Sequence, residues 1–189
     1  MLTAAETEFL QRVGIFAAIP PAGMARLGAL ARRVDIAGPS LVFAEGEPAQ
    51  EMVVVLKGML EVRKRGRSGS ETRIAVLRPG DIAGEMSLID IQPRSAAVRS
   101  LGTASLVVLT HADLAQFYRE DPSSYAMLVL NIAREISRRL RRVDALLADI
   151  LVGVQDLWAG AMAEAAGTGT GRTGGGSSGP ASSGGGSVP

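Results

Sequence analysis

A carboxylate and a guanidinium stand nine residues apart in the segment GEMSLIDIQPRSAAV, residues 84–98. The arginine, Arg94, can fork onto phosphate oxygens. The carboxylate of Glu85 needs a hydrogen-bond donor, and a ribose hydroxyl would supply one. Phosphate and ribose hydroxyl together indicate a nucleotide. The spacing alone leaves two interpretations open, a cradle for such a ligand and a surface ion pair in an ordinary loop.

The neighbours of this pair suit a phosphate group. Gly84 lets the backbone approach a ligand without a Cβ atom in the way. Residues 85–89 can form one or two helical turns, whose first N–H groups would point at an anion. Ser95 adds a hydroxyl and its own N–H. These residues favour the cradle without deciding for it.

Other kinds of site chemistry find little support in the sequence. The single histidine, His111, stands at a predicted helix start, where capping is a better explanation than catalysis. Cysteine is absent, and no His and carboxylate cluster has the spacing of metal ligands. No G-x-S-x-G, Walker A or GxGxxG pattern occurs. We therefore predict that the protein is not an enzyme and holds no metal or cofactor.

The elements that must position Glu85 and Arg94 are short strands. Helices come first: Thr3 and Glu6 form a capping-box pattern, and a second helix is expected after Pro20-Pro21. Between about Val34 and Thr110 the chain shows several short apolar runs separated by turn residues, which is typical of a sandwich or roll. We predict an α+β fold, with an antiparallel, jelly-roll-like β-roll flanked by N-terminal helices and a long C-terminal helix.

Helix returns at His111, where Thr110 is a suitable N-cap and Asp113 stands at the third helical position. Asp121-Pro122 then starts a long helix, expected over about residues 122–160. Its apolar residues recur in steps of four and three, the spacing of a coiled-coil seam. A helix face packed on its own domain would also explain them, but we favour a parallel homodimer. The predicted seam is Ile136, Leu140, Val143, Leu147, Ile150, Val154 and Leu157.

Composition sets further limits. The chain has 20 basic and 19 acidic residues, a net charge of +1, so no global field favours nucleic acid or an anionic membrane. The apolar run at 52–56 is too short to span a bilayer, and the N-terminus does not resemble a signal peptide. We predict a cytoplasmic protein with no membrane contact. One domain is expected over 1–160, followed by a disordered Gly/Ser-rich tail over 167–189, which could be a native tether or an added segment.

The segment GEMSLIDIQPRSAAV resembles the phosphate-binding cassette of the cyclic nucleotide-binding domain family. The resemblance covers about residues 9–150 and includes LQRVGIFAAIP, FAEGEPAQEMVVVLKGMLEV and LRPGDIAGEM. It implies that Glu85 accepts from the ribose 2′-hydroxyl and that Arg94 pairs with the cyclic phosphate. The base would lie against Val76 and Ile82 and be covered by the C-terminal helix, whose movement is the output of the family. The implied nucleotide-binding set is Gly84, Glu85, Met86, Ser87, Arg94, Ser95 and Ala96.

Two departures from the activators of this family matter. Val143 and Asp144 stand where those proteins place hydroxyl residues that read adenine, and we expect no helix-turn-helix after Trp158. The sequence therefore predicts a stand-alone sensor of cAMP or cGMP that switches an unknown partner protein through its C-terminal helix. Alternatives are a Crp/Fnr-like regulator without its DNA-binding domain and a β-roll that has lost its ligand. DNA binding through the five arginines between 134 and 142 is disfavoured, because the seam runs through them.

Overall fold

The fold is built on two four-stranded antiparallel sheets. We analysed a computed structural model, which describes residues 1–90 and 92–167. The first sheet has the order β1-β8-β3-β6, and its strands are β1 (Arg32–Ile36), β8 (Ala104–Thr110), β3 (Glu51–Lys57) and β6 (Ile82–Ala83). The second has the order β2-β7-β4-β5, and its strands are β2 (Ser40–Phe43), β7 (Ala97–Ser100), β4 (Leu60–Arg65) and β5 (Glu71–Leu77).

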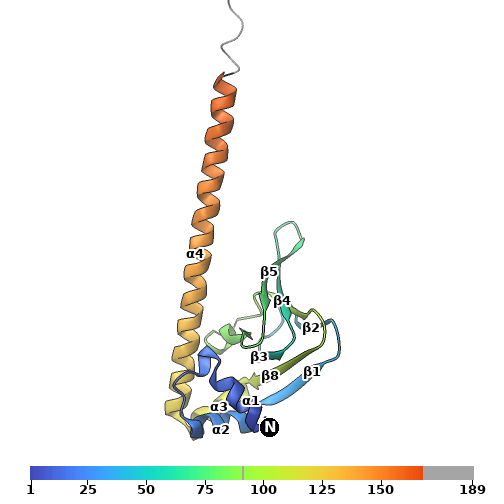
Figure 1. Cartoon of the computed structure of the whole chain (residues 1–189), viewed down its shortest axis with the longest axis vertical. Helices are drawn as coiled ribbons and strands as arrows, with labels where there is room; N and C mark the ends of the chain where they lie inside the picture. The colour runs from blue at the N-terminus through green and yellow to red at the C-terminus, as the bar shows by residue number, and fades with distance from the viewer. Residues whose placement is uncertain (91, 168–189) are drawn as a thin grey trace, which may run out of the picture. The chain divides into compact units, whose positions relative to one another are not determined.

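Alternate residues of a strand point to opposite faces of the sheet, and the central strands β3 and β8 are buried on both faces, whereas the edge strand β1 is largely exposed. Val53 and Val55 of β3 belong to a core that the two sheets share. Met52 and Val54 of the same strand belong to a second core, which contains Phe16 and other residues of the helices. This explains why β3 and β8 read as nearly continuous apolar runs. Figure 1 shows the N-terminal helical segment (residues 4–30) and residues 111–120 on one side of this sheet, and strands of the second sheet on the other.

The helices begin where the sequence provides caps. The side chain of Thr3 accepts from the N–H of Glu6, and that of Thr110 accepts from the N–H of Asp113, each within a complete capping box. Both caps were predicted, and both are confirmed. The helical elements are α1 (Ala4–Gln11), the 3-10 turn η1 (Gly14–Phe16), α2 (Pro21–Leu30), the 3-10 turn η2 (Glu85–Leu88), α3 (His111–Glu120) and α4 (Pro122–Gly167).

The first turns of α4 are fixed to the N-terminal segment. The buried amide of Asn131 donates to the carbonyl of Ile15 at 3.1 Å and to that of Ala17 at 2.7 Å. The chain divides into two compact units, Met1–Leu140 and the part from Arg141 onward, which are described separately. The first unit therefore contains the roll, the N-terminal helices and the start of α4.

The predicted fold class is confirmed: the structure is a β-roll with N-terminal helices and a long C-terminal helix. The short strand β6 was not predicted, since two residues are too few to show a period. The second helix ends at Leu30, and the first strand starts at Arg32, two residues earlier than expected. Helix α4 continues past Gly153 to Gly167. The rest of the predicted tail, 168–189, lies outside the described residues.

Candidate functional site

The segment between β6 and β7 holds Glu85 and Arg94, and it crosses from one sheet to the other. Strand β6 is the edge of the first sheet and β7 lies inside the second. The segment opens with η2, at whose start the predicted glycine stands. The side chains of Glu85 and Arg94 are both buried, with 2% and 8% of their surface exposed. A surface ion pair does not describe residues buried to this extent.

Gly84 has the backbone conformation and the close contacts that require glycine. Its φ is 84°, in the left-handed region that residues with a Cβ rarely adopt. A Cβ at this position would lie 2.4 Å from Nη1 of Arg94 and 2.8 Å from the carbonyl oxygen of Glu51. The Arg94 guanidinium therefore rests directly against the Gly84 backbone.

Arg94 is held firmly but is not saturated with hydrogen bonds. Its N–H donates to the Glu47 carbonyl and its own carbonyl accepts from the N–H of Gly46, each at 2.9 Å. The guanidinium carbon lies 3.6 Å from the ring centroid of Phe43, a cation–π contact. Nε and Nη1 are buried and have no hydrogen-bond partner among the described residues; Glu47 comes to 3.9 Å from Nε. Burial lowers the pKa of Arg94, and nearby carboxylates, Glu47 first, oppose that shift. Such a group is suited to an anion, because unpaired buried donors are costly.

Glu85 pairs with a residue of α4. Nη1 of Arg139 donates to Oε1 of Glu85 at 2.6 Å, and Nη2 donates to the Ile82 carbonyl at 3.3 Å. Nε of Arg139 lies 3.4 Å from Glu135, one turn earlier on the helix. Burial raises the pKa of Glu85, and the nearby charge of Arg139 acts in the opposite direction. A buried carboxylate is thus tied to the helix that leaves the roll.

The other residues of the predicted nucleotide-binding set lie around this pair. Ser87 is buried and donates to the Gly84 carbonyl at 2.7 Å, whereas Met86 is half exposed. Ser95 is exposed, and its carbonyl accepts from Nζ of Lys64. Ala96 is partly buried. The phosphate-side residues therefore stand at both ends of one segment, on η2 and next to β7.

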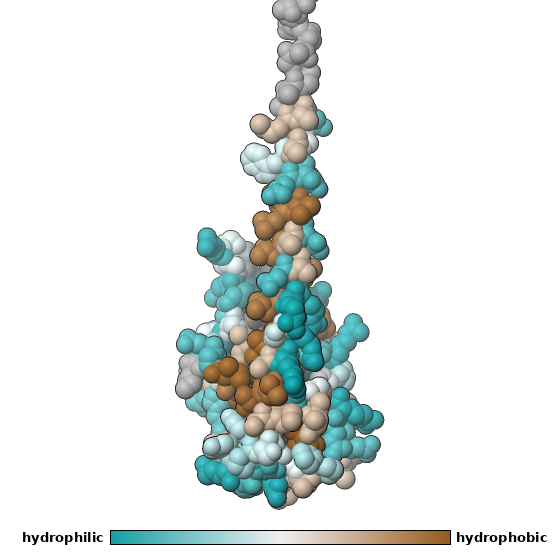
Figure 2. Space-filling view, turned by 90° about the vertical axis from the view of Figure 1, so that its left-hand side faces the viewer, coloured by the Kyte–Doolittle hydropathy of each residue, from teal (hydrophilic) through white to brown (hydrophobic). Residues whose placement is uncertain are grey.

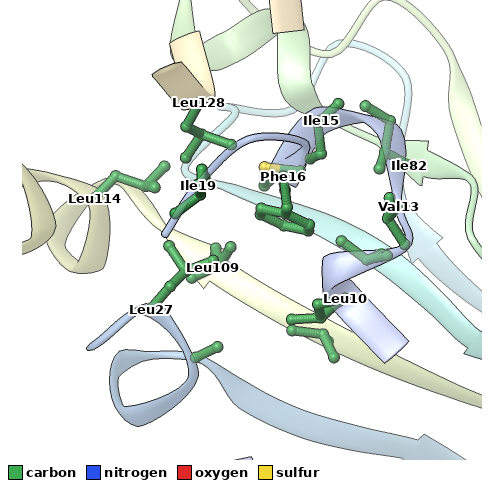
Figure 3. Close-up of a cluster of buried hydrophobic side chains, with 14 of the residues drawn as sticks. Leu10, Val13, Ile15, Phe16, Ile19, Leu27, Ile82, Leu109, Leu114 and Leu128 are labelled. Carbon is green, nitrogen blue, oxygen red and sulfur yellow. The ribbon is translucent and has the colours of Figure 1, made fainter. Parts of the chain in front are cut away.

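The two residues expected to meet the base lie in different surroundings. Val76 of β5 pairs with Glu61 and is 36% exposed. Ile82 is 3% exposed and belongs to the core beneath the helices, which also contains Val13 and Ile15 (Figure 3). Its side chain therefore packs within this core, and its carbonyl accepts a hydrogen bond from Arg139. The contact of these residues with a base stays a prediction.

The predicted seam of α4 starts within the domain. Ile136 is partly buried and packs against the core of its own roll. The remaining members are exposed, between 45% and 75%. Leu140 is the last of them in the first unit, and the others stand on the second. An 18-residue window of α4 with a mean hydropathy of 1.4, none of it buried, makes this helix long and apolar enough to cross a membrane.

Sequence reasoning missed two residues of the site. Phe43 stands 51 positions before Arg94, and its apolar strand gave no sign that its ring lies under a guanidinium. Arg139 is one of five arginines between 134 and 142. A signal for it existed: it follows Ile132 and Ile136 by seven and three residues, so it shares the helix face that packs on the roll.

The chain is similar to proteins of a known family. The profile of the cyclic nucleotide-binding domain matches residues 35–121. A CRP-like cAMP-activated global transcriptional regulator of Mycobacterium tuberculosis is 30% identical over 144 residues, which are 76% of this chain and 62% of that protein. Together with the fold and the buried Glu85 and Arg94, this defines the class: the chain belongs to the cyclic nucleotide-binding domain family. It spans less than two thirds of the length of this relative.

Solved structures agree with that assignment. The N-terminal domain of a transcriptional regulator from Streptomyces coelicolor is 31% identical with a TM-score of 0.61, and the match covers 72% of this chain and 95% of that domain. The catabolite activator protein of Thermus thermophilus is 28% identical with a TM-score of 0.64, covering 73% and 62%. From Pro122 to Gly167 the described chain is one continuous helix, so that stretch contains no helix-turn-helix.

Proposed function

We propose that the protein is a sensor of cAMP or cGMP and not an enzyme, and that it acts on a partner protein through α4. The observation that carries this is the Arg94 guanidinium, which is buried against Gly84 with two nitrogens that have no hydrogen-bond partner among the described residues. A cyclic phosphate would accept from those nitrogens and from N–H groups at the start of η2. The ribose 2′-hydroxyl would donate to Glu85.

The contact between Glu85 and Arg139 supports an output through α4. A ribose hydroxyl that reaches Glu85 would have to share or displace the 2.6 Å contact with Arg139. Because Arg139 is a residue of α4, occupation of the site would change the forces on the start of that helix. A ligand that binds two arrangements of α4 unequally shifts their populations. This coupling is the basis on which we propose signalling rather than storage of the nucleotide.

We further propose that two copies pair in parallel along the exposed seam of α4 and that the protein works in the cytoplasm. The seam residues from Leu140 to Leu157 have no cover in the single chain. Burying such a stripe against an identical helix removes its apolar surface from water. A regulator that acts on DNA is the alternative, since the Mycobacterium tuberculosis relative is a transcriptional regulator. DNA affinity that falls steeply with salt would favour this alternative.

The test is calorimetric titration of the full chain with cAMP, cGMP and cyclic di-GMP, supported by thermal shift. Wild type is expected to bind cAMP with micromolar or tighter affinity. Arg94→Ala leaves the phosphate without its charged partner, which costs about 2–5 kcal/mol. At about 1.4 kcal/mol per decade this weakens binding by about thirty- to several thousand-fold.

Arg99→Ala is the matched control. Arg99 lies on β7 only five residues further along the chain, is exposed, and pairs with Leu41 and Glu61 across the sheet. Its removal should leave the affinity unchanged within about twofold. Equal affinities for wild type and Arg94→Ala would refute the cradle. If none of the three nucleotides raised the melting temperature, the chain would instead be a β-roll without a ligand.

A further inference from the structure

The exposed apolar surface of α4 is wider than the predicted seam. In a heptad labelled a to g, three residues separate a from d and four separate d from the next a. Leu147 therefore stands at position a and Ile150 at position d. Three large apolar residues flank these positions, Leu146 at g and Leu151 and Trp158 at e, and they are 61%, 54% and 69% exposed. Figure 2 shows hydrophobic residues along much of the visible helix, with hydrophilic ones between them.

The flanks are unusual for a two-stranded coiled coil. In a pair of helices the e and g positions border the seam and normally carry charged residues that form interhelical salt bridges. From Leu146 to Gly160 none of these positions is charged. They are Leu146, Leu151, Gly153, Trp158 and Gly160. Two paired helices would leave both uncharged flanks largely in water, so the flanks predict additional helices against the pair.

The branching of the seam residues points the same way. β-Branched residues at a with leucine at d favour two strands, and the opposite order favours three or four. Here Leu140 and Leu147 stand at a, and Val143 and Ile150 stand at d. Only the last heptad, Val154 at a and Leu157 at d, has the order of a two-stranded coil. The central heptads therefore specify more than two helices.

A large side chain and a gap complement each other in such a bundle. In parallel helices a g residue faces the e residue five positions later on the neighbouring helix. By this rule Gly153 of one chain faces Trp158 of the next. A Cβ added at Gly153 or Gly160 would meet nothing within 4 Å, so neither glycine is required by packing within its own chain. Glycine weakens a helix interior, and room for a neighbouring indole ring explains why it stands here.

We infer that four copies of this chain associate through α4, as two of the pairs proposed above, in a parallel four-helix bundle. In it Leu146 and Leu151 cover the flanks of the seam, and Trp158 packs over Gly153 of the neighbouring helix. This inference rests on the proposed self-association along α4 and not on the bound nucleotide. Four helices bury the e and g positions that two helices leave exposed.

A lipid bilayer is the other environment that could cover this helix. Two carboxylates argue against it: Asp149 and Asp156 stand one heptad apart, on one face, inside the apolar stretch. Ionised groups at that depth are expensive in hydrocarbon. In the bundle both occupy position c, which faces water. A bundle therefore leaves these two carboxylates in water while it covers the broad apolar face.

The first measurement is the mass of the full chain by light scattering after size exclusion, at tens of micromolar. The bundle predicts four times the chain mass of 19.6 kDa. Trp158 is the only tryptophan, so its emission should shift to shorter wavelength as the bundle forms on concentration. Twice the chain mass would overturn the bundle and leave the pair standing, and three times would overturn the stoichiometry. The mass of one chain would overturn both.

Gly153→Leu is the decisive variant, because leucine is a better helix former than glycine and the change does not threaten the helix itself. It fills the space for Trp158, so the mass should fall to that of two chains and the emission should return to longer wavelength. Val152→Ser is the control, since Val152 is 55% exposed but stands at position f, which faces no neighbouring helix in the bundle. A Gly153→Leu protein that keeps four chains would refute the packing of Trp158. Co-sedimentation of wild type with phosphatidylcholine vesicles as single chains would assign the apolar face to a membrane.

Discussion

Replacement of Gly84 by alanine should affect both the stability of the fold and the affinity of the proposed binding site. Alanine in the left-handed region costs about 1–2 kcal/mol. For a chain of this size each kcal/mol lowers the melting temperature by about 2–4 °C, so the backbone conformation alone should lower it by about 2–8 °C, and the 2.8 Å approach of the Cβ to the Glu51 carbonyl oxygen adds to that loss. The added Cβ would lie 2.4 Å from Nη1 of Arg94, so the guanidinium must move away.

That movement has a predictable effect on affinity. A hydrogen bond to a charged group is worth about 1.5–3 kcal/mol. Losing one of the bonds that Arg94 is proposed to form with the phosphate would weaken nucleotide binding by about ten- to one-hundred-fold. The assay is calorimetric titration with cAMP, combined with a melting curve of the same sample.

Gly80→Ala is the control, because Gly80 has a φ of 94° but nothing lies within 4 Å of a Cβ at that position. It should lose the stability that the backbone conformation accounts for, which is less than Gly84→Ala loses, and it should keep its affinity. If Gly84→Ala bound cAMP as tightly as Gly80→Ala did, Arg94 would not be a phosphate ligand in the observed position.

Further changes test the surroundings of the site. Burial raises the pKa of Glu85 above its value in the unfolded chain, so ionisation of Glu85 destabilises the folded state. The folded state is therefore most favoured by this group below about pH 4.5, where Glu85 is neutral in both states. That stabilisation is lost as the pH rises through the raised pKa. Glu85→Gln should therefore gain stability relative to wild type in urea titrations as pH rises above about 4.5, while it binds nucleotide more weakly. A stability difference that does not change with pH would contradict the burial. Arg139→Met removes the positive charge that offsets the burial of Glu85, so stability should fall more steeply as the pH rises. In a protein that already carries Glu85→Gln, Arg139→Met should not change the pH dependence of stability, which a double-mutant cycle would show. Asn131→Ala leaves the carbonyls of Ile15 and Ala17 unpaired and should cost about 1–3 kcal/mol of unfolding free energy; a loss within experimental error would show that other groups satisfy those carbonyls.

Local chemistry made the elements predictable. The capping boxes at Thr3 and Thr110 depend on residues three positions apart. Such signals are complete within a short window of sequence.

The environment of the site was less accessible, because it depends on contacts between distant segments. Glu85 and Arg94 were identified through their spacing and a family resemblance, yet the sequence did not show that Arg139, 54 positions later, reaches Glu85. Phe43 under Arg94 is similar, since any apolar residue on β2 would fit the strand pattern. Ile136 packs against its own roll because of the direction in which α4 leaves the domain. The heptad spacing of apolar residues does not predict that direction.

The route of the segment from Gly84 to Ala96 has a mechanical consequence. It starts at the edge strand of one sheet and ends at an inner strand of the other, while the backbone of Arg94 is bound to the β2–β3 connection. A molecule held by both Glu85 and Arg94 would therefore be a cross-link between the two layers of the roll. Pulling the layers apart would require breaking that cross-link as well as the shared core. The empty protein should yield at lower force than the occupied one, with the difference confined to loads applied across the sheets.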